Sequence, residues 1–115
     1  MPLTWINGPI IAAGESLSEP VDLTGGNLLR ITMPKTWNDA EISFQISTDG
    51  EAFNDLINWN GQEVRIPVTI GAAVLLPPDL MRGIGFIKIR SGSTSNPREQ
   101  DEQRNFALTV ETAAG

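Results

Sequence analysis

Residues 41–47 (EISFQIS) alternate polar and apolar side chains without a break. On a pleated strand this period of two places all the apolar side chains on one face and the polar ones on the other. The next residues, 48–51 (TDGE), are typical of a tight turn, because Gly50 adopts a positive φ at no steric cost. A second strand at residues 53–57 completes a predicted β-hairpin, which is the local feature that decides the fold.

The same alternation continues on both sides of this hairpin. Pro67 cannot donate to a β-ladder, so the strand that contains it is predicted to lie at a sheet edge. We find no apolar repeat of 3.6 residues long enough for a sizeable helix. About seven to nine short strands favour a single all-β antiparallel sandwich of jelly-roll type, with an Ig-like sandwich as the alternative. The further strands are predicted at residues 28–33, 64–70, 86–90 and 106–111, with weaker candidates at 9–12, 17–23 and 72–76.

The chain has 115 residues, which suits one domain spanning residues 1–115. Residues 1–8 are interpreted either as an N-terminal arm that packs on another subunit or as the first strand of the sandwich. The chain contains no Cys and no His, which excludes thiolate and imidazole chemistry and an ordinary transition-metal site. We therefore expect no cofactor.

The charge balance is acidic, with 14 Asp and Glu against 8 Lys and Arg and a net charge of −6. Such a chain repels a phosphate backbone, so a nucleic-acid partner is not expected. Its longest apolar stretch, residues 72–78, is far too short to span a bilayer. The first residues lack the basic and apolar regions of a secretory signal, which predicts synthesis and folding in the cytoplasm.

Three tryptophans are the first candidates for contacts with a ligand or partner. Trp37 lies just before the best strand and is interpreted as a plug that closes one end of the sandwich. Trp59 lies in a turn between Asn58 and Asn60, and an exposed indole there would stack on a sugar ring or dock on a partner. Trp5, in the first residues of the chain, is the third candidate contact.

The acidic side chains are interpreted as turn-forming and solubilising groups. Asp49, Glu51 and Asp55 gather near one turn, but calcium takes six to eight oxygen ligands and this cluster supplies too few. Hydrolysis of a glycosidic bond would need two facing carboxylates, and no spacing selects such a pair. We therefore predict a protein that is not an enzyme.

The longest polar segment runs from residue 92 to residue 104 (GSTSNPREQDEQR). Long loops in a compact domain are often functional, and hydrogen-bonding groups in this one suit contact with a neighbouring subunit or another partner. Arg98 and Gln100 are the candidate contact residues of this loop.

The whole pattern resembles that of a known class of proteins. Its most specific part is Pro34-x-x-Trp37-x-x-Ala40-x-Ile42-x-Phe44-Gln45-x-Ser47-x-Asp49-Gly50. The pattern also includes Ile87-Lys88-Ile89-Arg90-Ser91-Gly92-Ser93, Pro97, Gln100 and Arg104. Over residues 15–111 the chain is similar to small accessory virion proteins of tailed bacteriophages and gene transfer agents, especially those of alphaproteobacteria.

The resemblance implies a non-enzymatic β-sandwich on the surface of a virion. Its role there would be that of a capsid decoration protein, the base of a head spike or a fibre-associated module. The implied partners are capsid or other virion proteins, further copies of the chain and, in the alternative function of an adhesin, a polysaccharide of the host surface. The pattern contains no catalytic residue, and Trp37, Phe44, Asp49 and Gly50 are interpreted as core and turn positions.

Overall fold

The structure is a computed structural model that describes residues 2–77 and 79–112. These residues form eight β-strands and no helix, so no membrane-spanning helix occurs in this part of the chain. In chain order the strands are β1 (Leu3–Ile11), β2 (Val21–Asp22), β3 (Gly26–Thr32), β4 (Ile42–Ser47), β5 (Asn54–Asp55), β6 (Ala73–Leu75), β7 (Phe86–Ser91) and β8 (Arg104–Thr112).

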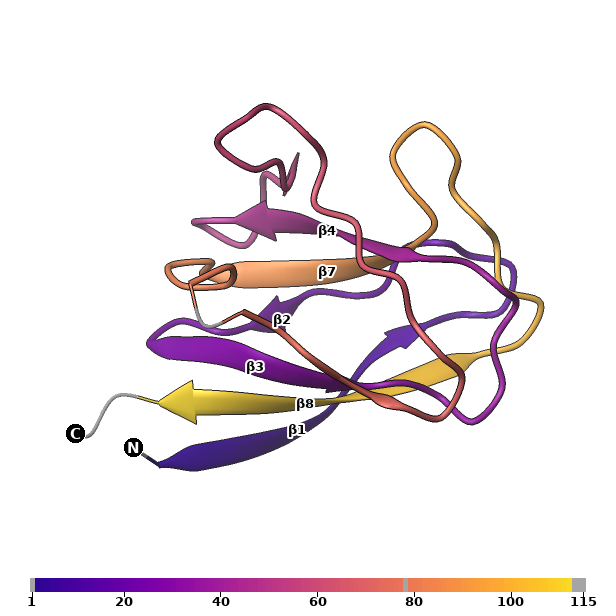
Figure 1. Cartoon of the computed structure of the whole chain (residues 1–115), viewed down its shortest axis with the longest axis horizontal. Helices are drawn as coiled ribbons and strands as arrows, with labels where there is room; N and C mark the ends of the chain where they lie inside the picture. The colour runs from indigo at the N-terminus through magenta and orange to yellow at the C-terminus, as the bar shows by residue number, and fades with distance from the viewer. Residues whose placement is uncertain (1, 78, 113–115) are drawn as a thin grey trace.

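The strands make two four-stranded sheets that stack on each other (Figure 1). The strand order is β1-β8-β3-β6 in one sheet and β2-β7-β4-β5 in the other. Four antiparallel pairs join the two halves of the chain, namely β1 with β8, β2 with β7, β3 with β6 and β4 with β5. This is the connectivity of a long hairpin rolled into two sheets, so the predicted jelly roll is confirmed and the Ig-like alternative is wrong.

The apolar core lies between the sheets and is built from the side chains that the two-residue period turns inward. Phe44 of β4 and Ile89 of β7 are paired in register and wholly buried. Leu28 and Ile31 of β3 and Leu108 of β8 meet them from the opposite sheet. The alternation in residues 41–47 therefore has the predicted orientation, with its apolar face inside.

Trp37 closes one end of the sandwich, as predicted. Its side chain is buried, and its ring meets Phe106 edge-on with the ring centroids 5.6 Å apart. The indole Nε1 donates a hydrogen bond to the carbonyl oxygen of Ala40 at 3.0 Å, which satisfies the polar atom that burial removes from water.

The predicted edge strand at residues 64–70 is wrong, because this segment joins β4 through a single bridge. Ile66 exchanges two backbone hydrogen bonds with Ile42, at 2.9 and 3.0 Å. The next carbonyl along that edge of β4, on Phe44, already accepts from the N–H of Leu56 at 3.0 Å. The chain just after β5 therefore occupies the edge that a longer strand would need. β5 itself is shorter than the predicted residues 53–57.

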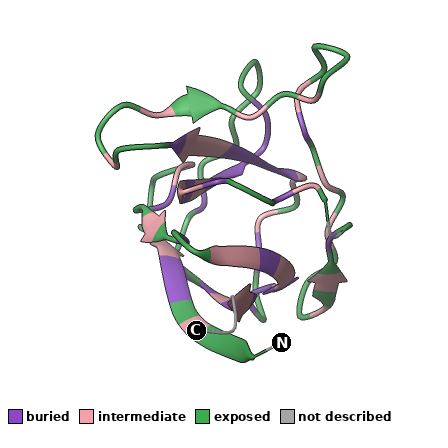
Figure 2. Ribbon diagram, turned by 90° about the vertical axis from the view of Figure 1, so that its left-hand side faces the viewer, coloured by how far each residue is buried: buried purple, intermediate pink, exposed green. Residues whose placement is uncertain are grey.

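The first residues of the chain belong to the sandwich. Residues 3–8 are part of β1, which pairs with β8 from Leu3↔Glu111 to Ile11↔Arg104. Of the two interpretations of residues 1–8, the first strand is thus the one found, while Met1 lies outside the described residues. Figure 2 shows the half of β1 nearest the N-terminus coloured as exposed, unlike its second half.

Candidate functional site

A loop that follows β5 rises above β4 at the top of Figure 1. We call residues 57–63 of this loop the finger, because a bridge between Ile57 and Glu63 closes its base. Trp59 lies in the finger and is 93% exposed, more than any other large apolar residue among the described ones. The prediction that Trp59 is exposed is therefore confirmed.

The turn that carries Trp59 is held by its neighbours. The side-chain Oδ1 of Asn58 accepts hydrogen bonds from the backbone N–H groups of Asn60, at 2.9 Å, and Gln62, at 3.0 Å. The N–H of Asn58 donates to the carbonyl of Gln62 at 2.7 Å, and the N–H of Gly61 donates to the carbonyl of Asn58 at 2.9 Å. Gly61 has a φ of 80°, which favours glycine. Asn58 thus shapes the turn and Trp59 is displayed on it.

Arg90 of β7 braces both ends of the finger. Its side chain is 8% exposed; Nη2 lies 2.6 Å from Oδ1 of Asp55, before the finger, and Nη1 lies 3.2 Å from Oε2 of Glu63, at its end. Nη1 also donates to the hydroxyls of Thr94, at 2.9 Å, and Ser43, at 3.2 Å. One buried guanidinium therefore ties the finger to β4 and to the loop after β7.

We call Arg90 and its partners Asp55, Glu63, Thr94 and Ser43 the brace. Further hydrogen bonds surround its two carboxylates. The backbone N–H of Thr94 donates to Oε2 of Glu63 at 3.0 Å, and the Thr94 hydroxyl donates to the same oxygen. The hydrogen bond from Arg90 holds the pKa of Asp55 below its ordinary value; burial opposes this shift, and a hydrogen bond from Gln45 adds to it. The bonds from Arg90 thus favour the charged form of Asp55.

Trp5 lies on the other sheet. It belongs to β1, is 66% exposed and lies in register with Thr109 of β8, which in turn is in register with Arg30 of β3 and, through it, Leu75 of β6. Directly paired residues point to the same side of a sheet, so these four side chains form one row across its outer face. Trp5 and the finger therefore lie on different sheets of the sandwich.

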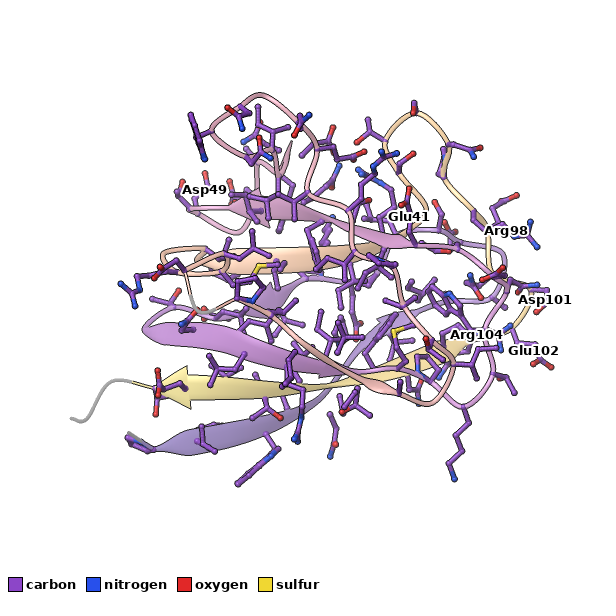
Figure 3. All side chains as sticks on the ribbon, in the orientation of Figure 1. Glu41, Asp49, Arg98, Asp101, Glu102 and Arg104 are labelled. Atoms are coloured by element: carbon purple, nitrogen blue, oxygen red, sulfur yellow. The ribbon has the colours of Figure 1, made fainter. Side chains whose placement is uncertain are left out.

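A groove of about 450 Å³ opens at the end of the sandwich where Glu41 and Arg98 lie (Figure 3). Charged, amide, proline and small apolar residues line it together. Oε1 of Glu41 is 3.3 Å from Nη1 of Arg65. The groove places the predicted contact Arg98 in a hollow, and its lining comprises Asp39, Ala40, Glu41, Pro67, Val68, Gly92, Asn96, Pro97 and Arg98.

Gln100 has a different role from the predicted surface contact, because it is wholly buried. Its Oε1 accepts from the N–H of Asn38 at 2.7 Å and from Nε of Arg104 at 3.0 Å. Its Nε2 donates to the carbonyl of Asn38 at 3.0 Å and to the hydroxyl of Ser91 at 2.8 Å. Arg104 also bonds Asp101, and the two are seen at one end of Figure 3. Gln100 is therefore a structural link between loops.

The acids near the hairpin do not converge. Oδ1 of Asp49 accepts from the N–H groups of Glu51, at 2.9 Å, and Ala52, at 3.1 Å, and these bonds hold the pKa of Asp49 below its ordinary value. Asp55 points instead to Arg90. In residues 2–77 and 79–112, no group of three or more His, Cys, Asp or Glu residues could hold a metal ion.

Sequence reasoning identified the finger and missed the brace beneath it. Arg90 alternates with apolar residues on β7 like any outward side chain, and no spacing in the sequence pairs it with positions 55 and 63. The structure does not bring Trp59, Trp5 and Arg98 together, because they belong to the finger, the outer face of one sheet and the end groove. Comparisons with protein-family models, with curated proteins and with solved structures give no match for this chain.

Proposed function

We propose that this protein is a non-enzymatic structural component of a tailed-phage virion, a capsid decoration or a component of a head spike or fibre. In this role it attaches to capsid or other virion proteins on the particle surface. The observation that carries the proposal is the exposure of Trp59 on an ordered turn. A large side chain held in place before binding loses little conformational freedom when it docks, which is how an anchor residue contributes affinity.

The construction of the finger supports an attachment role. Exposed apolar residues are common on protein surfaces when they are scattered singly. Here a buried arginine donates to four side chains, one of which is Glu63 of the finger, and so ties the loop that carries the tryptophan to the sandwich. Many copies on one particle would each need only a modest contact, because multivalent attachment multiplies weak affinities.

The resemblance supplies the virion context of the proposal. The most specific residues of its pattern are structural in this chain, since Phe44 and Trp37 are core residues and Asp49 bonds its own turn. The resemblance therefore supports the class of domain that we propose, whereas the finger supports the way in which we propose that this domain attaches.

The test is incorporation into particles. Virions from a host that produces the wild-type chain are purified and analysed by mass spectrometry, and the protein is located in particle images. We expect the wild type to copurify with particles and Trp59→Ala to reduce its occupancy at least about fivefold, while Ile70→Ala, which removes another exposed apolar side chain, has little effect. A wild-type protein that never copurifies with particles contradicts the proposal.

A carbohydrate-binding adhesin module is the second candidate, and the same tryptophan favours it. The indole of Trp59 is open on its ordered turn, next to the exposed amide residue Asn60, and stacking on a sugar ring needs such a flat face beside hydrogen-bonding groups. A glycan array separates the two functions. Binding by the wild type that is lost in Trp59→Ala supports the adhesin; binding that is lost only in Arg98→Ala assigns the sugar to the end groove; the absence of glycan binding contradicts it.

A further inference from the structure

The first half of β1 is an open sheet edge. β1 is the terminal strand of its sheet, paired with β8 on one side only. Beyond Gly8 the edge is covered, because the N–H of Glu19 donates to the carbonyl of Ile10 at 3.2 Å. Residues 3–7 are therefore the part of this edge that another strand can reach.

The hydrogen-bond alternation shows which groups face that edge. The N–H of Thr112 donates to the carbonyl of Pro2 at 3.0 Å, so this pair is hydrogen-bonded across the two strands. Bonded and non-bonded pairs alternate in an antiparallel ladder, which makes Thr4 and Ile6 the next residues bonded to β8. Leu3, Trp5 and Asn7 consequently direct their N–H and C=O groups away from β8, toward the open edge.

The side chains of these three residues lie on the outer face of the sheet. Leu3 is 46% exposed and Trp5 66% exposed. All nine residues of β1, Leu3–Ile11, are uncharged in a chain whose net charge is −6. Natural sheet edges are usually protected by charged side chains, and an apolar edge without them is a template for pairing with another strand.

We propose that this edge pairs with the same edge of a second copy of the chain. An antiparallel pairing centred on Trp5 places Trp5 opposite Trp5 of the second copy and Leu3 opposite its Asn7. The arrangement has two-fold symmetry, uses every outward N–H and C=O of residues 3–7 and extends the sheet to eight strands. Because the paired segments contain no charged residue, the pairing places no like charges opposite each other, although each chain is acidic.

The dimer is an inference about this chain alone and holds whatever surface the finger binds. Because β1 and the finger belong to different sheets, each dimer leaves both Trp59 side chains free. Two fingers on one rigid body would give the bivalent contact that strengthens attachment to a repeating surface.

The first test is the mass of the protein in solution, measured by sedimentation equilibrium over a range of protein concentrations. We expect a monomer–dimer equilibrium for the wild type and loss of the dimer in Trp5→Lys, which places two like charges opposite each other. Leu75→Lys adds the same charge at an exposed position on the outer face, at the other edge of the same sheet, and should leave the dimer intact. A wild type that stays monomeric overturns the proposal, and a dimer that survives Trp5→Lys assigns it to another surface.

The second test fixes the register and leaves Trp5 in place. The chain has no cysteine, so each introduced thiol is the only one. Residues opposite each other in an antiparallel pair have Cα atoms about 4.5–5.5 Å apart, within the range of a disulfide. We expect an oxidised mixture of Leu3→Cys and Asn7→Cys proteins to form the mixed disulfide dimer, whereas each variant alone crosslinks much less. Equal crosslinking in all samples contradicts the proposed register.

Discussion

Nη2 of Arg90 lies 2.6 Å from Oδ1 of Asp55, in a pair whose arginine is 8% exposed and whose aspartate is 36% exposed. Removing a guanidinium from water is costly unless acceptors surround it. Glu63, Thr94 and Ser43 supply the remaining acceptors around Nη1. The position of the finger therefore depends on a charged group inside the protein, since none of residues 57–63 belongs to the apolar core.

Replacing Arg90 tests this dependence. Arg90→Met keeps much of the apolar length and leaves Asp55 and Glu63 without their shared cation, so we expect a loss of about 1–3 kcal/mol in the free energy of unfolding. Urea denaturation measures it. The matched control is Arg65→Met, since Arg65 is 53% exposed and its bond to Glu41 is a surface ion pair. We expect a change within about 0.5 kcal/mol there, and equal effects of the two variants would show that Arg90 is not a brace.

The same pair makes stability depend on pH. The pKa of Asp55 is lowered in the folded protein by the hydrogen bond from Arg90, so its carboxylate stabilises the fold above the unfolded pKa of about 4. This stability is lost as the pH falls through the lower folded pKa. Asp22 and Asp49, whose pKa values are lowered by hydrogen bonds from their own turns, act in the same direction.

The pH dependence is checked by thermal unfolding between neutral pH and about pH 2. We expect the Tm of the wild type to fall in the acid range and to fall less in Asp55→Asn, whose side chain does not titrate. The Tm of Asp39→Asn should follow that of the wild type, because Asp39 is an exposed acid outside the brace. An Asp55→Asn curve that runs parallel to the wild-type curve would remove Asp55 from the acid response.

The turn below Trp59 has its own prediction. Asn58→Ala removes the oxygen that accepts two backbone N–H groups, so we expect the finger to open more often and stability to fall by about 1 kcal/mol. Limited digestion with chymotrypsin, which cleaves after tryptophan, should cut at Trp59 faster than in the wild type. Asn60→Ala is the control, because only the backbone of Asn60 takes part in these bonds. Identical cleavage rates in both variants would show that the Asn58 side chain does not hold the turn.

Sequence patterns were sufficient for the architecture because period-two alternation is a local property. In residues 41–47 the pattern alone identifies the buried face, and the structure places Phe44 in the core with its side chain wholly buried. Where a long-range pairing competes for the same backbone group, the local pattern is not sufficient. Residues 64–70 alternate as well as any strand, yet the N–H of Leu56 takes the carbonyl of Phe44 and leaves the segment a single bridge.

The candidate site was predictable only in its exposed part. Trp59 lies between Asn58 and Asn60, residues typical of a turn, and turns lie at the protein surface, so its exposure could be predicted. Gln100 belongs to an equally polar segment and is buried, because Asn38, Ser91 and Arg104 satisfy the polar atoms of its side chain. Composition describes a loop as polar, but only the packed fold shows which polar groups face one another.

The loop before β7 allows the last prediction, at Gly85. This residue has a φ of 78°, and a Cβ added to it would lie 2.5 Å from the carbonyl oxygen of Ser47, an atom of the backbone that cannot swing away. Gly85→Ala therefore combines left-handed backbone strain with a clash inside the sheet that contains β4 and β7. We expect a loss of about 3 kcal/mol or more in unfolding free energy, measured by urea denaturation.

Gly61→Ala separates the two causes. Gly61 has nearly the same φ, 80°, but no heavy atom lies within 4 Å of the added Cβ, so only the backbone strain of about 1–2 kcal/mol applies. The difference between the variants measures the clash with Ser47. If both variants lose the same unfolding free energy, the loop before β7 moves and relieves the close approach of Gly85 to β4. That loop then does not fix the sheet from which the finger extends.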